Sequence, residues 1–277
     1  MPLRIHVQQA IEEARALVSQ PRFLRAPVDV FALAREVGVA EFERREMSAD
    51  GYLGQRDDGT LVVRYRSANS HHRNRFTVAH EIGHILLCRI EGTSLAARGR
   101  ERTSSPEEET AANRIASELL MPVRLVRGAL AAQGHATTRR WGTIAALRHY
   151  FDVSRTAMAI RMLEIPGLDA LLFRINVEGR GSRFPLDLSE NARFRLLRTE
   201  NYETDRLWRE TRRSNRHRVP INTDRGPAVM HCEGLMHSAK TRYGSVRQYW
   251  VIGWMSPEPT GQASHNGAQQ TTLYNDT

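Results

Sequence analysis

The stretch HEIGH at residues 80–84 constrains the fold more than any other part of the chain. It lies in a segment, residues 73–89, whose apolar residues recur at helical spacing, which predicts one long helix. Residues four apart lie one above the other on a helix, so His80 and His84 can reach the same metal ion. Glu81 then stands beside that ion, where a carboxylate can take a proton from a metal-bound water. The pattern predicts a catalytic metal site with Glu81 as general base.

A catalytic zinc ion usually takes three protein ligands and leaves one position open, so another segment must supply a ligand. A second helix is predicted at residues 105–120. Ser105 suits its N-cap, Pro106 its first position, and Glu108 the capping-box position. Pro122 disfavours helical geometry in the residue before it, which predicts where this helix ends.

Three glutamates at residues 107–109 occupy the first turn of this helix, where the helix dipole alone would favour acidic residues. Glu108 is used by the capping box, and Glu107 shares its stripe mainly with polar residues. Glu109 shares its stripe with Asn113 and two apolar residues, which predicts an inward direction. We therefore predict that Glu109 is the third metal ligand. Asn113, one turn later, is predicted to hydrogen-bond the free nitrogen of a ligating histidine.

Two stretches of the chain together resemble the ImmA/IrrE family of zinc metallopeptidases. They are RFTVAHEIGHILL at residues 75–87 and EETAANRIASELLMP at residues 108–122, and the resemblance extends over residues 27–165. In that family the glutamate four residues before the asparagine binds zinc, which again indicates Glu109. Ile115 stands where the family often has phenylalanine, a change within the core.

The resemblance implies a zinc-dependent endopeptidase with a narrow substrate range. Family members typically cleave a helix-turn-helix repressor or antitoxin, which switches on a stress or mobile-element response. The expected cofactor is Zn²⁺, although Mn²⁺ also suits such a ligand set. The sequence does not single out the residue that would stabilise the oxyanion in the transition state.

We predict an α+β chain in four parts. Besides the two helices already described, helical patterns occur at residues 3–20 and 28–37, and extended segments at 41–46 and 60–65 flank an Asp-Asp-Gly turn that suggests a hairpin. The predicted parts are a zincin-like catalytic domain with a small sheet at 1–136, a helix-turn-helix-like module at 137–165, a separate C-terminal α+β domain with a sensor or substrate-docking role at 166–256, and a disordered tail at 257–277.

The chain is strongly basic, with a net charge of +9 and a sequence pI of about 10.3. Such a charge attracts nucleic acid or an acidic protein partner, although an arginine-favouring coding bias would also produce it. It motivates a rival hypothesis, a DNA-binding transcriptional regulator with a structural or vestigial metal site. The predicted helix-turn-helix-like module is itself basic, through Arg139, Arg140, Arg148, Arg155 and Arg161. Direct DNA contact is nevertheless less favoured than packing support or repressor docking.

Several features predict a cytoplasmic protein that does not enter a membrane. No apolar run approaches the ~20 residues of a membrane span, and the acidic residues at 12 and 13 favour an amphipathic helix over a secretion signal. Cys88 and Cys232 are far apart and predict neither a disulfide framework nor a zinc site. His71 and His72 are predicted to be surface residues rather than ligands.

Overall fold

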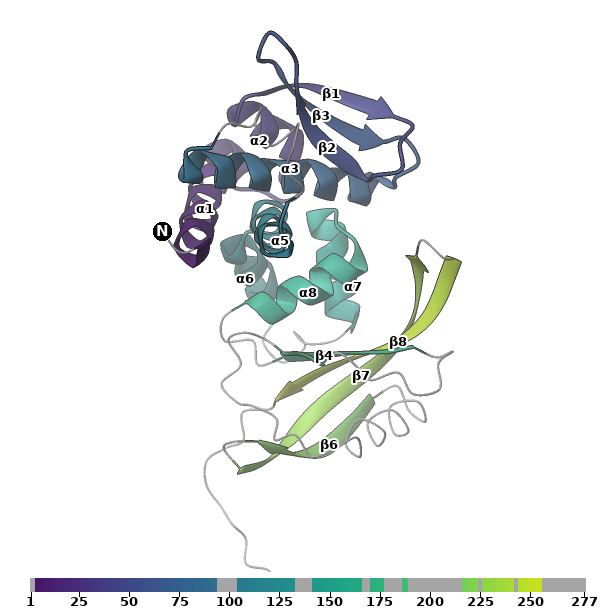
Figure 1. The fold of residues 1–277 in the computed structure, drawn as a ribbon. Coiled ribbons are helices and arrows are strands. Elements are labelled where there is room, and N and C mark those ends of the chain that lie inside the picture. Colours follow the sequence, from purple (N-terminus) through teal and green to yellow (C-terminus); the bar gives the residue numbers. More distant parts are fainter. Residues whose placement is uncertain are drawn as a thin grey trace, which may run out of the picture.

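Figure 1 shows the computed structural model, which describes residues 3–93, 104–132 and 141–165 and the strand residues 170–176, 186–188, 216–223, 226–241 and 244–255. Among these residues the chain is a mixture of helices and two sheets, in line with the predicted α+β class. None of the described helices combines the length and apolar character that a bilayer span requires.

The N-terminal part comprises helices α1 (Leu3–Val18), α2 (Val30–Glu36), α3 (His71–Glu91) and α5 (Pro106–Leu120), a short 3-10 turn (Pro21–Phe23), and strands β1 (Val39–Arg45), β2 (Gly51–Gln55) and β3 (Leu61–Arg66). The three strands form one sheet in the order β1-β3-β2. This sheet packs on one side of α3, whereas α5 crosses the other side (Figure 1).

The predicted hairpin exists, but one of its strands differs from the prediction. The segments predicted as extended become β1 and β3, and these pair in parallel. The strand that pairs across the turn at residues 57–59 is β2, which runs antiparallel to β3. β2 was missed because its sequence, GYLGQ, has two glycines and a weak strand pattern. Gly51 is required there, since an added Cβ would clash with Thr77 and lie 2.7 Å from the carbonyl oxygen of Arg64.

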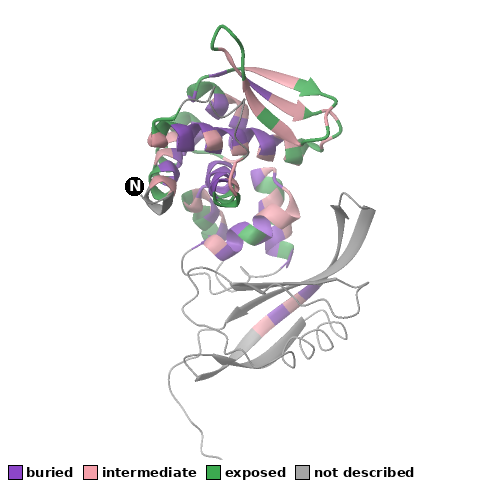
Figure 2. Cartoon of the chain, in the orientation of Figure 1, coloured by how far each residue is buried: buried purple, intermediate pink, exposed green. Residues whose placement is uncertain are grey.

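Helices α3 and α5 form the centre of the molecule, and both are buried along much of their length (Figure 2). The two helices pack tightly at Gly83 of α3, where an added Cβ would lie 3.0 Å from both the Cα and the carbonyl oxygen of Ala112 on α5. One continuous cluster of buried side chains extends from Ala10 on α1 to Ile165. The helices that follow α5 therefore share the core of α3 and α5.

Three further helices follow α5: α6 (Val123–Ala132), α7 (Trp141–Phe151) and α8 (Arg155–Glu164). α7 and α8 lie within the segment predicted as a helix-turn-helix-like module, and Ser154 caps the N-terminus of α8, but α6 was not predicted. Arg161 of α8 is buried, and its guanidinium donates to Glu118 at 2.7 Å and to the carbonyl oxygen of Met121 at 2.8 Å. Arg161 is one of the five arginines that make this pair basic in the sequence. In the structure its charge is paired with Glu118 in the interior. Arg139 and Arg140 lie outside the described residues.

The C-terminal part contains strands β4 (Ala170–Asn176), β5 (Leu186–Leu188), β6 (Arg216–Thr223), β7 (Gly226–Thr241) and β8 (Gly244–Met255). They form an antiparallel sheet in the order β5-β4-β8-β7-β6. The α7 helix contacts it through Trp141, whose indole nitrogen donates to the carbonyl oxygen of Glu233 at 2.8 Å. The predicted helical component of this part and the predicted tail at 257–277 lie outside the described residues. Its status as a separate domain, like the helix-turn-helix-like character of α7 and α8, stays a prediction.

Candidate metal centre

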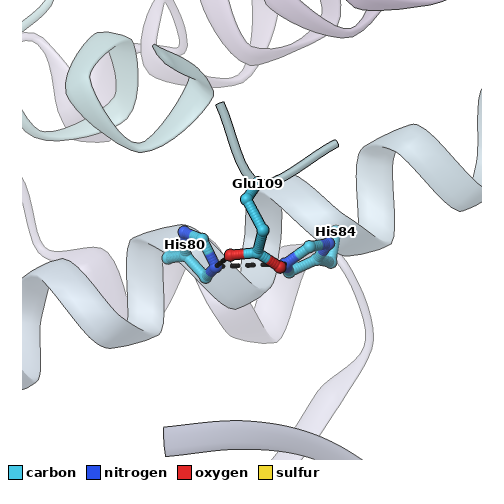
Figure 3. A group of neighbouring side chains, drawn as sticks. All are labelled: His80, His84 and Glu109. Atoms are coloured by element: carbon cyan, nitrogen blue, oxygen red, sulfur yellow. Dashed lines mark hydrogen bonds and ion pairs between the residues drawn. The ribbon is translucent and has the colours of Figure 1, made fainter. Parts of the chain in front are cut away.

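The two histidines of the HEIGH stretch lie at the middle of α3, which is well terminated at both ends. Ser70 caps its N-terminus by accepting a hydrogen bond from the backbone N–H of Arg73, and Gly92 ends the helix in the left-handed conformation. The helix therefore begins two residues before the predicted start. Because α3 is regular across residues 80–84, both imidazoles project from one side toward α5 (Figure 3).

The structure brings His80, His84 and Glu109 together (Figure 3). The Nε2 atoms of the two histidines are 3.0 Å apart, and they lie 3.2 and 3.4 Å from the two carboxylate oxygens of Glu109. Ligand atoms at 2.0–2.1 Å from a tetrahedral zinc ion are about 3.3–3.4 Å from one another. The donor atoms are therefore of the kinds that a divalent metal ion binds, and they lie at the distances from one another that such an ion requires. Their role as ligands stays a prediction.

Asn113 orients one of these imidazoles. Its Oδ1 lies 3.0 Å from Nδ1 of His80, and an amide oxygen can only accept a hydrogen bond. The ring proton therefore sits on Nδ1, which leaves the lone pair of Nε2 directed at the ligand group. Burial lowers the pKa of His80, while the charge of Glu109 opposes this change. The imidazole is thus held in the neutral form that a metal needs.

Glu81 is buried next to this group, on the side of the sheet. Burial raises its pKa to about 7, the charge of Glu109 adds to the effect, and a hydrogen bond with the backbone of Leu53 on β2 opposes it. A bound cation would act in the opposite direction and favour the carboxylate. Glu81 is therefore a carboxyl group that can exchange a proton near neutral pH, which is the property of a general base.

The start of α5 determines which of the three glutamates reaches the histidines. Ser105 and Glu108 form the predicted capping box, so Glu108 is buried and faces back toward the N-cap. Glu107 is exposed, whereas the Glu109 side chain is 46% exposed and faces α3. The stripe assigned to Glu107 is less polar than expected, since Ala111 and Glu118 are both buried.

A cleft of about 1040 Å³ opens over the group. Its walls come from β2, α3, α5 and α8, and the metal-ligand candidates, Glu81 and Asn113 all line it. The contribution of α8, through Ala157, Ile160 and Glu164, could not be inferred from the sequence because it depends on tertiary packing. Among the residue types suited to stabilise an oxyanion, Tyr52, Arg73 and Arg114 line this cleft.

The other histidines and cysteines considered are not part of this group. His71 and His72 lie in the first turn of α3 and contact Asp152, at 2.7 and 3.3 Å. Cys88 and Cys232 are buried and not joined in a disulfide. Among the residues that the structure describes, the only group of three histidine, cysteine or acidic side chains that fits a metal is His80, His84 and Glu109.

Comparison with known families identifies the part of the chain that carries this group. Residues 34–163 match the Peptidase M78 model, described as the IrrE N-terminal-like domain. This match supports an ImmA/IrrE family assignment for the region. The resemblance seen in the two sequence stretches is thereby confirmed. The match suggests a metallopeptidase-like function for this part of the chain.

The fold has a counterpart among solved structures. A Mycobacterium tuberculosis transcriptional regulator superposes with a TM-score of 0.56 and 13% sequence identity, over 90% of this chain and 76% of that one. At this identity the likeness concerns the fold alone. A search of curated proteins finds no significant match.

Proposed function

We propose that this protein is a zinc-dependent endopeptidase that hydrolyses a peptide bond in a helix-turn-helix repressor or antitoxin in the cytoplasm, and so relieves repression. The observation that carries the proposal is the spacing of the donor atoms of His80, His84 and Glu109, 3.0–3.4 Å apart, with the buried carboxyl of Glu81 beside them. Zn²⁺ is the expected ion, and Mn²⁺ is the alternative that the same donors accept.

Different residues of the chain take different roles in the proposed reaction. When bound, zinc would polarise the scissile carbonyl and lower the pKa of the attacking water. Glu81 accepts the proton of that water at its carboxylate and donates it to the amine that leaves. Asn113 keeps the proton of His80 on Nδ1, away from the donor group. The walls around Glu81 exclude bulk water, which keeps its proton affinity high.

Strand β2 offers a means of holding a polypeptide in this cleft. It is at the edge of its sheet, with β3 as its neighbour on one side, and its residues Gly51, Tyr52 and Leu53 line the cleft. An extended segment of a substrate can add to such an edge through main-chain hydrogen bonds. A linker or loop of a repressor would meet this requirement, whereas a folded helix would have to unwind first.

The rival function is a DNA-binding regulator with a structural metal site. A structural zinc site is usually closed by four protein ligands. Here three candidate ligands are found among the described residues, and the group opens into a large cleft. The open position favours catalysis. The basic helix pair gives the rival weaker support, because one of its arginines, Arg161, is buried in an ion pair.

Glu81→Gln tests the proposal. We expect this variant to fold and to bind one equivalent of zinc, but to lose cleavage of any helix-turn-helix repressor that the wild type cleaves, because an amide cannot accept the water proton. Cleavage is followed by the appearance of fragments on a gel and by mass spectrometry. Normal cleavage by Glu81→Gln would contradict the role given to Glu81. Salt-dependent DNA binding together with no cleavage by the zinc-loaded wild type would favour the rival.

A further inference from the structure

A second cleft, of about 650 Å³, lies between α1, α5, α6 and α8. It shares Arg114 and Glu164 with the cleft over the metal group. Arg114 follows Asn113 directly in α5, so the second cleft begins next to the residue that contacts His80. The two clefts are therefore adjacent.

The charge of this second cleft is strongly positive at its rim. Four arginines that line it are exposed, namely Arg15, Arg114, Arg124 and Arg127. Its floor holds Arg161, whose charge is satisfied by the buried Glu118 at 2.7 Å and by Glu164 at 2.7 Å. Five arginines against two glutamates leave a net charge of +3 in the lining. Glu118 also lies 3.5 Å from Arg15, so two arginines of the cleft share this carboxylate.

The remaining lining indicates which kind of anion fits. Ile11, Val18 and Val123 place apolar surface between the arginines, and this surface suits the aliphatic part of acidic side chains. A concave site of this size also suits a peptide segment better than a DNA duplex, which is usually read by a protruding helix or strand.

We propose that this arginine-lined cleft, next to the metal group, binds an acidic segment of the substrate polypeptide on one side of the scissile bond. This proposal rests on the proposed endopeptidase function, which defines the substrate and the scissile bond. The cleft itself selects glutamate- or aspartate-rich sequence, and its exposed arginines set the preference.

Binding is measured with the full chain carrying Glu81→Gln and loaded with zinc, so that no probe is consumed. The probes are fluorescein-labelled peptides that share one apolar, extended half. Their other half is rich in glutamate, in glutamine or in lysine. We expect the glutamate peptide to bind at least about tenfold more tightly than the glutamine peptide, and the lysine peptide to bind most weakly. Raising the salt from about 50 to about 300 mM should reduce this preference.

The decisive variant is Arg124→Glu with Arg127→Glu, in the same Glu81→Gln background. A glutamate at position 124 lies in the first turn of α6, where the helix dipole favours it, so we expect the helix to form. The glutamate preference should fall about tenfold or disappear. Arg25→Glu with Arg66→Glu is the matched control, since both arginines are exposed and neither lines either cleft. Melting temperatures check that both double variants fold.

Three outcomes would overturn the proposal. The first is equal binding of the glutamate and glutamine peptides, and the second is an equal loss of preference in the control variant. The third is displacement of the glutamate peptide by duplex DNA at equal charge concentration, with DNA binding lost in the α6 variant. That result would assign the cleft to nucleic acid. Failure of the zinc-loaded wild type to cleave helix-turn-helix repressors concerns the proposed function alone, because the binding measurement does not depend on cleavage.

Discussion

Helix α3 carries two pairs of histidines, and each pair meets one carboxylate from a later segment. His71 and His72, in its first turn, contact Asp152 in the turn between α7 and α8, at 2.7 and 3.3 Å. His80 and His84, near its middle, contact Glu109 of α5, at 3.2 and 3.4 Å. The residue types are the same and the distances are similar. The two groups nevertheless differ in what they can do.

Spacing along the helix and the surrounding charges explain the difference. Neighbouring side chains diverge by about 100° around a helix, whereas residues four apart lie on one side. The Nε2 atoms of His80 and His84 therefore converge to 3.0 Å. In the first group a guanidinium already satisfies the acid, since Arg75 lies 3.3 Å from Asp152. The first group links α3 to the α7–α8 turn, and the second has the geometry of a metal site.

The largest expected effect is on metal binding in Glu109→Ala. Loss of one of three protein ligands should lower zinc affinity by more than the roughly 10–100-fold expected for loss of an outer partner. Asp152→Ala should leave the zinc content unchanged and lower the melting temperature instead. Zinc is measured by elemental analysis after dialysis and by titration against a chelator.

Glu108→Ala is the matched control for that comparison. It removes the capping box of α5 and should cost about 1 kcal/mol of stability, with zinc retained. Retention of zinc in Glu109→Ala together with its loss in Glu108→Ala would show that the ligand has been assigned to the wrong glutamate. Loss of zinc in Asp152→Ala would remove the distinction between the two histidine groups.

Asn113→Ala tests whether α5 also orients one of the two histidines of the metal group. His80 would lose the acceptor that holds its proton on Nδ1, so the ring could turn or change tautomer. Zinc affinity should fall by roughly 10–100-fold, with little change in stability, because Asn113 is an exposed residue. Thr110→Ala, on the same helix and in the same cleft, is the control and should bind zinc as the wild type does. Equal affinity in both variants would mean that Asn113 does not orient His80.

Gly83→Ala tests whether the contact between α3 and α5 sets the position of Glu109. The new methyl group would lie 3.0 Å from the backbone of Ala112, so α5 has to move by a few tenths of an ångström. We expect a loss of about 1–3 kcal/mol in unfolding free energy and a weaker zinc affinity. Gly128→Ala on α6 has open space around the new methyl group and should stabilise the protein by about 0.5–1 kcal/mol. A Gly83→Ala variant as stable as the wild type would show that this packing is not restrictive.

The sequence allowed prediction of those features that depend on local chemistry. The HEIGH spacing, the capping box at Ser105 and the stripe of Glu109 all follow from helix geometry, and the structure brings these residues together. Strand β2 could not be predicted, because its Gly51 is needed only where Thr77 of α3 passes close to it. The contact of Trp141 with Glu233, 92 residues later, also depends on the tertiary fold.

The smallest expected effect concerns the first histidine group and is a pH dependence of stability. Burial lowers the pKa of His72. The charge of Asp152 opposes this change, and the positive charges of His71, Arg148 and Arg75 add to it. The folded protein therefore binds a proton at His72 less readily than the unfolded chain does. The contribution of His72 to the free energy of unfolding is present above the pKa that His72 has in the unfolded chain. It is lost as the pH falls through the pKa that His72 has in the folded protein.

His72→Gln should remove the loss of stability that protonation of His72 causes at acidic pH. Between about pH 7.5 and about pH 5.5, where histidine titrates, the melting temperature of the zinc-loaded wild type should fall more than that of His72→Gln. The difference should be smaller than the effect of Gly83→Ala, because the His72 side chain is 37% exposed and solvent screens its charges. His6→Gln on α1 is the control for removal of a histidine elsewhere. A steeper fall in His72→Gln than in the wild type would mean that protonated His72 strengthens the contact with Asp152, and that this group stabilises the fold more at acidic than at neutral pH.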